Sequence, residues 1–153
     1  MTEPIWRTAP TGSDVPVGAS GVTQVAERVV VDTDILIDAA RMRPEATDVL
    51  QSLSATAELC VSVVTEMELV VGCQNKAELR ALDTFLDRFR VEPVTERVSA
   101  GAVGLLRRYR LSHGLLIADA LIASTAIGLE CRLLTKNQRD FAYIRSLAVI
   151  PYP

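Results

Sequence analysis

The sequence has few of the residues that a zinc protein or a disulfide scaffold needs. Its 153 residues include three cysteines and one histidine, and no two cysteines form a C-x-x-C pair. These are too few nitrogen and sulfur ligands for a zinc site. An odd number of cysteines without a signal peptide indicates a reducing compartment. We therefore expect a cytoplasmic protein whose thiols are buried as small hydrophobic groups.

Long apolar runs and an excess of basic charge are also missing. No stretch approaches the roughly 18 apolar residues of a membrane-spanning helix, so we expect no membrane segment. The net charge is −3 and the pI is about 5.2, which argues against passive binding of nucleic acid through a basic face. The charge does not exclude a nuclease, because a carboxylate site that binds divalent cations presents positive charge to a phosphate.

What the sequence does contain is enough apolar material for one domain of ordinary size. Hydrophobic residues make up 49% and aromatic residues 5%, so the core is expected to consist mainly of aliphatic side chains. Residues 1–28 hold three of the seven prolines and show no period of 2 or 3.6. This composition predicts a flexible or irregular extension before a domain at residues 29–153.

Short β-branched runs alternate with amphipathic segments along that domain. Strands are predicted at residues 28–31, 59–64, 91–94, 131–135 and 147–150. Helices are predicted at residues 35–40, 44–53, 65–73, 76–89, 95–109, 117–129 and 138–143. The alternation predicts an α/β fold, in which a mainly parallel central sheet is flanked by helices on both faces.

Acidic and polar residues follow the ends of several predicted strands. In an open parallel sheet, ligands gather beyond the carboxyl ends of the strands. The residues at those ends are Asp32, Asp34, Glu68, Asp119, Thr135, Lys136, Asn137 and Asp140. Crowded carboxylates repel one another, and a divalent cation relieves the repulsion. Hard oxygen ligands of this kind suit Mg²⁺ or Mn²⁺, so the spacing is compatible with a metal site.

Each acid also has a purely structural explanation. Asp34 fits a helix cap, Thr65 with Glu68 fits a capping box, and Asp119 fits the first turn of a helix. Asp32 fits such a role least well, because an acid directly after a buried strand is poorly placed to cap a helix. Asp119 is next, since its neighbours are apolar on both sides and an unpaired charge there is unfavourable.

Four segments, taken in order, resemble the four motifs of the PIN domain. They are Val31–Asp38, Val61–Leu69 with Gly72, Ile117–Ala123, and Leu134–Asn137 with Asp140 and Phe141. The match extends from about Val29 to Pro151 and includes the spacing between motifs. Within that family, the arrangement is most similar to the VapC toxins of bacterial and archaeal toxin–antitoxin pairs.

The resemblance implies a metal-dependent endoribonuclease. The implied metal ligands around one or two Mg²⁺ or Mn²⁺ ions are Asp32, Glu68, Asp119 and Asp140. Thr33 and Asn137 would support the site. Asp34 stands where the family usually has Asn or Ser, so it either adds a fifth acid or only caps the helix. Metal-activated water would then hydrolyse an RNA phosphodiester.

The same resemblance implies partners. A toxin of a type II toxin–antitoxin system has a cognate antitoxin that covers the active-site groove, and a homodimer is expected. The predicted helices at residues 65–73 and 76–89 carry apolar positions that are candidate docking faces wherever the core does not cover them.

The remaining charged and titratable side chains have open roles. Five basic residues either guide the phosphate backbone or are ordinary solvated charges: Arg107, Arg108, Arg110, Lys136 and Arg139. His113 is expected in a loop beside Gly114, and a metal-activated water does not require it as a base.

Three rival interpretations stay open at this point. Asp32 and Asp34 after a strand also resemble the nucleophile motif of haloacid-dehalogenase phosphotransferases, a family that has no use for Glu68 and Asp119. A phospho-receiver domain takes Lys136 as its lysine but lacks its phosphate-accepting acid at a central strand. A PIN-like module that has lost catalysis only binds a partner. Metal-dependent RNA cleavage that is lost in Asp119→Asn separates the nuclease from all three.

Overall fold

Within residues 26–152, which a computed structural model describes, five parallel strands form one central sheet. The strands are ordered β3-β2-β1-β4-β5 across the sheet. Their bounds are β1 (Glu27–Val31), β2 (Ala57–Ser62), β3 (Arg90–Glu92), β4 (Arg132–Leu134) and β5 (Val149–Ile150). The predicted α/β fold with a parallel sheet is confirmed.

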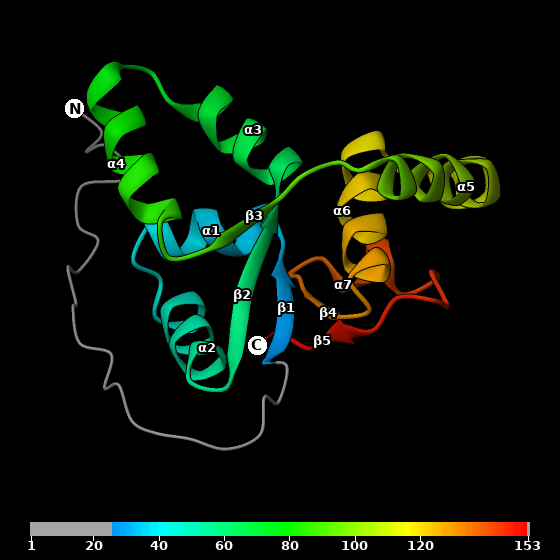
Figure 1. The fold of residues 1–153 in the computed structure, drawn as a ribbon, viewed down its shortest axis with the longest axis horizontal. Helices are drawn as coiled ribbons and strands as arrows, with labels where there is room; N and C mark the ends of the chain where they lie inside the picture. The colour runs from blue at the N-terminus through cyan, green and yellow to red at the C-terminus, as the bar shows by residue number, and fades with distance from the viewer. Residues whose placement is uncertain (1–25, 153) are drawn as a thin grey trace.

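The helices of the described chain cover both faces of this sheet (Figure 1). On one side lie α1 (Thr33–Ala40), α2 (Pro44–Ser54), α3 (Val63–Gly72) and α4 (Lys76–Leu86). On the other side lie α5 (Glu96–His113), α6 (Ile117–Gly128) and the short α7 (Gln138–Phe141). Helices on both faces are the reason why the strands read as unbroken apolar runs.

Alternation along β1 divides the interior into two cores. Val29 and Val31 face the core under α1–α4, whereas Val30 faces the core under α5 and α6. Successive residues of a strand point to opposite faces of the sheet, so one short strand anchors both cores. Because β1 lies between β2 and β4, neighbouring strands on both sides hold its C-terminal end in place.

Several ends of the elements differ by a few residues from the predicted bounds. β1 begins at Glu27, one residue before the predicted start of the first strand at residue 28. Most of the predicted extension, residues 1–25, lies outside the described residues and stays a prediction. Helix α5 runs to His113, four residues beyond the predicted end at residue 109. Gly114 ends it with a φ of 75°, a left-handed conformation that favours glycine.

The cysteines pack as the composition predicts. Cys60 is fully buried in the core under α5 and α6, and burial raises the pKa of its thiol to about 12. Cys131 packs against the same core, and Cys73 packs against the other one. A thiol held neutral in this way is chemically inert. Along the part of the chain that the structure describes, no helix is long and apolar enough to cross a membrane.

Helices α5 and α6 are in close contact where Gly101 faces Ser124. The Ser124 hydroxyl is buried and donates to the backbone oxygen of Val98 at 2.7 Å. A Cβ atom at residue 101 would overlap that hydroxyl. We expect Gly101→Ala to destabilise the fold by about 1 to 3 kcal/mol in urea unfolding, although alanine favours a helix.

Gly104 supplies the matched control for this prediction on the same helix. Nothing lies within 4 Å of a Cβ atom built there, so Gly104→Ala should stabilise the protein by about 0.5 to 1 kcal/mol. Removing the hydroxyl in a Gly101→Ala/Ser124→Ala double variant should recover part of the loss. Equal stability of the two single alanine variants would contradict the proposed close contact.

Candidate active site

The predicted carboxylates gather at the carboxyl edge of the sheet, between β1 and β4. The chain proceeds from β1 outward through β2 to β3, and then crosses to β4 on the other side of β1. This crossing makes the β1–β4 border the topological switch point, where open α/β sheets bind ligands. The backbone N–H of Asp32 donates to Leu134 at 2.9 Å and holds the two strand ends together.

Asp32 is the buried centre of this site. Its side chain has an exposed fraction of 5%. One oxygen accepts the backbone N–H of Thr33 at 2.8 Å, and the other accepts the hydroxyl of Thr135 at 2.7 Å. Asp32 is thereby also the N-cap of α1. The expectation that Asp32 is poorly placed to cap a helix was wrong, because α1 begins directly after the strand.

Glu68 reaches the site from the second turn of α3. Its Oε2 accepts a hydrogen bond of 2.5 Å from the hydroxyl of Thr33, and Thr33 also shares a hydrogen bond with Thr65 at 3.1 Å. The capping-box explanation was wrong, because α3 begins at Val63 and its N-cap is Ser62. Glu68 is therefore directed toward Thr33 at the carboxyl edge of the sheet.

Three further acids complete the cluster. Asp119 lies in the first turn of α6 and is half-buried. Asp140 lies on α7, where Asn137 Nδ2 donates to its Oδ2. Asp34 is exposed in the first turn of α1. Asn137 and Thr33 thus contact the acids that they were predicted to support.

Electrostatic repulsion within the cluster is unrelieved. Burial raises the pKa of Asp32 to about 6, with smaller increases from the charges of Asp34 and Asp119, although Thr135 and Thr33 lower it by hydrogen bonding. Burial also raises the pKa of Asp119 to about 6, followed by the charges of Asp140, Glu68 and Asp34. No side chain of residues 26–152 forms an ion pair with any of these five acids.

The chemistry of this donor set fits a hard divalent cation. Four or five carboxylates in mutual repulsion offer oxygen ligands and negative charge. Within residues 26–152, however, no three His, Cys, Asp or Glu side chains are already arranged as ligands around one point. Glu68 and Asp140 instead accept hydrogen bonds from Thr33 and Asn137. Each of these two carboxylates keeps a second oxygen and further lone pairs for a cation, because one hydrogen bond does not saturate it.

Two of the basic residues that were considered for RNA guidance have structural partners instead. Lys136 Nζ lies 2.9 Å from Oδ2 of the buried Asp38 and ties the loop after β4 to α1. This ion pair raises the pKa of Lys136 above its usual value. The guanidinium of Arg110 donates to the backbone oxygens of Gly114 and Leu115, so it satisfies the C-terminal end of α5.

Sequence reasoning missed two features beside the carboxylates. Thr135 hydrogen-bonds to Asp32 and was left without a role. His113 was expected in a loop, but it is the last residue of α5, and its ring stacks on Tyr143. A hydroxyl directly after the fourth strand was the available signal for Thr135. No local signal pairs His113 with Tyr143, because they are 30 residues apart in the chain.

Comparison with known proteins agrees with this geometry. The family described as PIN domain matches residues 29–147. Ribonuclease VapC10 of Mycobacterium tuberculosis is 38% identical over 120 residues, which cover 78% of this chain and 90% of that protein. Ribonuclease VapC1 of Methanocaldococcus jannaschii is 28% identical over 127 residues, which cover 82% and 87%.

Solved structures give the same result. A chain of the toxin–antitoxin complex from Klebsiella pneumoniae superposes with a TM-score of 0.66 at 30% identity, covering 80% of this chain and 96% of that one. A chain of VapBC2 from Rickettsia felis, bound to a promoter DNA fragment, superposes with a TM-score of 0.71 at 26% identity, covering 82% and 99%. This chain belongs to the PIN-domain family. Within the family, its relatives include the VapC ribonucleases.

Proposed function

We propose that this chain is an endoribonuclease that uses Mg²⁺ or Mn²⁺, and that it is the toxin of a type II toxin–antitoxin pair. One observation carries the proposal: acids from four segments of a PIN domain converge at the switch point of its sheet. Within residues 26–152, no basic side chain forms an ion pair with them. The acids are Asp32, Glu68, Asp119 and Asp140. The relatives named ribonuclease support RNA as the substrate.

The buried and the more exposed acids of the site have different roles. Asp32 is held rigidly by Thr33 and Thr135 and provides a fixed ligand at the base of the site. Glu68, Asp119 and Asp140 would hold the cation from the more open side, with Asn137 orienting Asp140. A bound divalent cation supplies the charge that activates water and stabilises the developing negative charge on the phosphodiester.

The prediction that Asp34 caps the helix was wrong, because the N-cap of α1 is Asp32, and two other roles remain for Asp34. Its exposed position in the first turn of α1 fits a favourable interaction with the helix dipole. Its charge also raises the pKa of both Asp32 and Asp119, so it adds to the negative potential that attracts a cation. We include it in the site as a supporting acid.

The rival functions have less support. The hydrogen bonds to both oxygens of Asp32 fix its position, but they fit a metal ligand and an aspartyl nucleophile equally well. The PIN match over residues 29–147 also accounts for Glu68 and Asp119, which the phosphotransferase and receiver interpretations do not use. A catalytically silent module has little support, because all four acids are present and clustered.

Partners follow from the same proposal. The toxin–antitoxin complexes among the similar structures support a cognate antitoxin. Helix α3 carries the exposed apolar residues Met67, Val70 and Val71, which suit such a contact, whereas Leu82, Phe85 and Leu86 of α4 are buried in the core. We further propose a homodimer, testable by light scattering, and action in the cytoplasm, where RNA is accessible.

The experiment that tests this function is RNA cleavage by the purified protein after removal of any antitoxin. With Mg²⁺ or Mn²⁺ we expect cleavage, with EDTA none, and restored cleavage when the metal is returned. Asp32→Ala should be inactive, because it removes the buried ligand. Asp48→Asn, an exposed acid on α2, is the matched control and should cut normally. Equal cleavage by wild type and Asp32→Ala would refute the proposal.

A further inference from the structure

Three aromatic rings form a cluster beside the carboxylates, and two of them are stacked. The ring of His113 lies over the ring of Tyr143 with centroids 4.1 Å apart and planes 20° apart. Tyr109 supports both from the side, at 5.9 Å from His113 and 5.1 Å from Tyr143. Tyr109 is buried, Tyr143 is half-buried and His113 is exposed. One face of the His113 ring is therefore covered by Tyr143, and the ring presents its other side to solvent.

The stack is close to the proposed cleavage site. Tyr143 is three residues after Asp140, and His113 is six residues before Asp119. Burial raises the pKa of Tyr143, and the charges of Asp140 and Asp119 raise it further. These charges act on the Tyr143 phenol only because it lies near them. The aromatic rings therefore flank the carboxylate cluster on the α5–α7 side.

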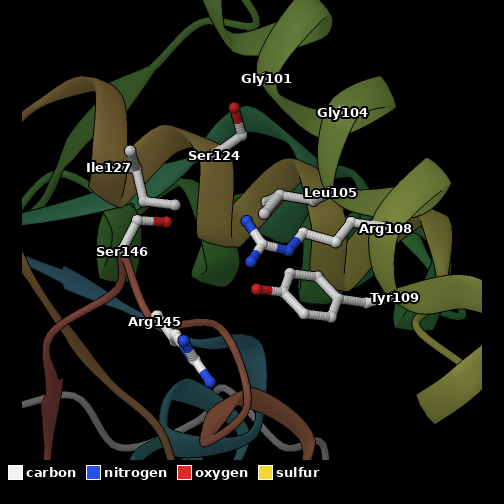
Figure 2. A pocket seen from close by; sticks show the side chains of 9 residues that line it. All are labelled: Gly101, Gly104, Leu105, Arg108, Tyr109, Ser124, Ile127, Arg145 and Ser146. Atoms are coloured by element: carbon white, nitrogen blue, oxygen red, sulfur yellow. The ribbon is translucent and has the colours of Figure 1, made fainter.

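Tyr109 also lines a pocket of about 360 Å³ with a mixed polar and apolar wall. Figure 2 shows the Arg108 guanidinium and the Tyr109 hydroxyl directed into it from α5, with Arg145 and Ser146 on the opposite wall and the Arg145 guanidinium turned outward. Arg108 also lies over the Tyr109 ring, with its guanidinium carbon 5.3 Å from the ring centroid. Within residues 26–152, neither arginine forms an ion pair with an acid.

The stack and the pocket share Tyr109. Ser124 and Ile127 of α6 line the pocket. At a helical rise of about 1.5 Å per residue, they lie about 7.5 and about 12 Å along α6 from Asp119. An RNA strand whose phosphodiester lies at the carboxylates would contact the stack first and the arginines next. We name this set of residues the stacking surface: Arg108, Tyr109, His113, Tyr143 and Arg145.

We propose that the stacking surface binds unpaired RNA next to the cleavage site. A base lies on the open side of the His113–Tyr143 stack, and a phosphate of a neighbouring nucleotide binds to Arg108 at the pocket, while Arg145 on the outer side of the opposite wall adds positive charge along the strand. This inference rests on the proposed function and extends it, because it assigns the side chains that bind the RNA strand beside the cleavage site.

The chemistry of the surface favours single-stranded RNA over a duplex or a protein partner. A base offers its face to an aromatic ring only when it is unstacked, as in loops and single strands. Stacking rings combined with cationic side chains along the backbone are the recurring features of single-strand binding. The chain has a net charge of −3, so two arginines without acidic partners on one surface make a local site for an anionic strand.

The test uses full-length, antitoxin-free protein and one RNA oligonucleotide, supplied single-stranded or annealed to its complement. Dissociation constants are measured by fluorescence anisotropy in an Asp119→Asn background over a range of salt concentrations. KM and kcat are measured in otherwise wild-type protein. The variants are Arg108→Gln, Arg145→Gln, His113→Ala, Tyr143→Leu and Tyr143→Phe. Arg80→Gln, which removes an exposed arginine from α4, is the matched control.

We expect each arginine variant to weaken single-strand binding several-fold and to reduce the salt slope by about 0.7. His113→Ala and Tyr143→Leu should raise KM on the order of tenfold, with a smaller change in kcat. Tyr143→Phe should behave as wild type, because it keeps the ring. Duplex RNA should bind more weakly and lose little affinity in these variants.

Different results overturn the stacking surface and the proposed nuclease. Wild type that cuts RNA, with the arginine and ring variants matching Arg80→Gln in KM and affinity, overturns the stacking surface and leaves the nuclease intact. Duplex that binds as tightly as single strand also overturns it. Binding through these residues without any metal-dependent cleavage retains the surface and overturns the nuclease. Arg108 and Arg145 are exposed, so their variants stay informative even if Tyr143→Leu folds poorly.

Discussion

Asp119→Asn is expected to lower RNA cleavage by more than about a hundredfold while it stabilises the metal-free protein. The loss of activity follows from removing a carboxylate ligand while keeping the shape of the side chain. The gain in stability follows from removing a half-buried charge that Asp140, Glu68 and Asp34 repel. Cleavage assays in Mg²⁺ and urea unfolding in EDTA measure the two effects on the same preparation.

The pH dependence of the stability difference gives the second part of this prediction. The pKa of Asp119 is about 6 in the folded protein, against a model-peptide value of 3.8. A raised folded-state pKa contributes stability that is fully present below 3.8 and is lost as the pH rises through about 6. Asparagine does not titrate, so the advantage of Asp119→Asn should grow over this range. After allowance for solvent exposure, it should reach about 1 kcal/mol above pH 7.

Asp48→Asn controls for the loss of an exposed carboxylate outside the site. It should change neither the rate of RNA cleavage nor the stability of the metal-free protein by much. Mg²⁺ should raise the melting temperature of wild type more than that of Asp119→Asn, because a ligand of the folded state stabilises it in proportion to its affinity. Asp119→Asn that is less stable than wild type in EDTA at neutral pH would show that the carboxylate cluster is not under electrostatic strain.

The general position of the site could be predicted from the sequence because it follows from topology. Alternating strands and helices imply a parallel sheet, and the carboxyl ends of parallel strands lie at one edge. Asp32 and Asp119 could therefore be assigned to one site without any knowledge of distances. The boundaries of the elements were less accurate: α3 begins at Val63 because Ser62 caps it, although Thr65 with Glu68 fits a capping box equally well in sequence.

The partners of individual side chains could not be predicted, because they depend on contacts between distant segments. Lys136 pairs with Asp38 across 98 residues, so a lysine that reads as a candidate phosphate ligand is a structural link. Asp32 shows the opposite case, since it both caps α1 and forms the base of the proposed metal site. A structural role and a chemical role do not exclude each other, so local rules alone cannot decide between them.

Phe141→Ala is expected to lower the free energy of unfolding by about 3 to 5 kcal/mol. It should also slow RNA cleavage under conditions in which the variant is still folded. The Phe141 side chain is 1% exposed and lies in the core under α5 and α6. It belongs to α7, a helix of four residues that is too short to persist without tertiary contacts. Because Asp140 is the preceding residue, the burial of Phe141 holds that carboxylate at the site.

Two control substitutions distinguish the loss of packing at Phe141 from the displacement of Asp140. Phe141→Leu keeps most of the buried volume and should cost about 1 kcal/mol, with cleavage largely retained. Arg139→Ala removes an exposed side chain from the same turn and should change stability by less than about 0.5 kcal/mol. Cleavage is measured at a temperature and denaturant concentration at which each variant is folded by circular dichroism. If folded Phe141→Ala cut RNA at the wild-type rate, the anchoring of Asp140 by the core would be refuted, and Asn137 alone would have to position it.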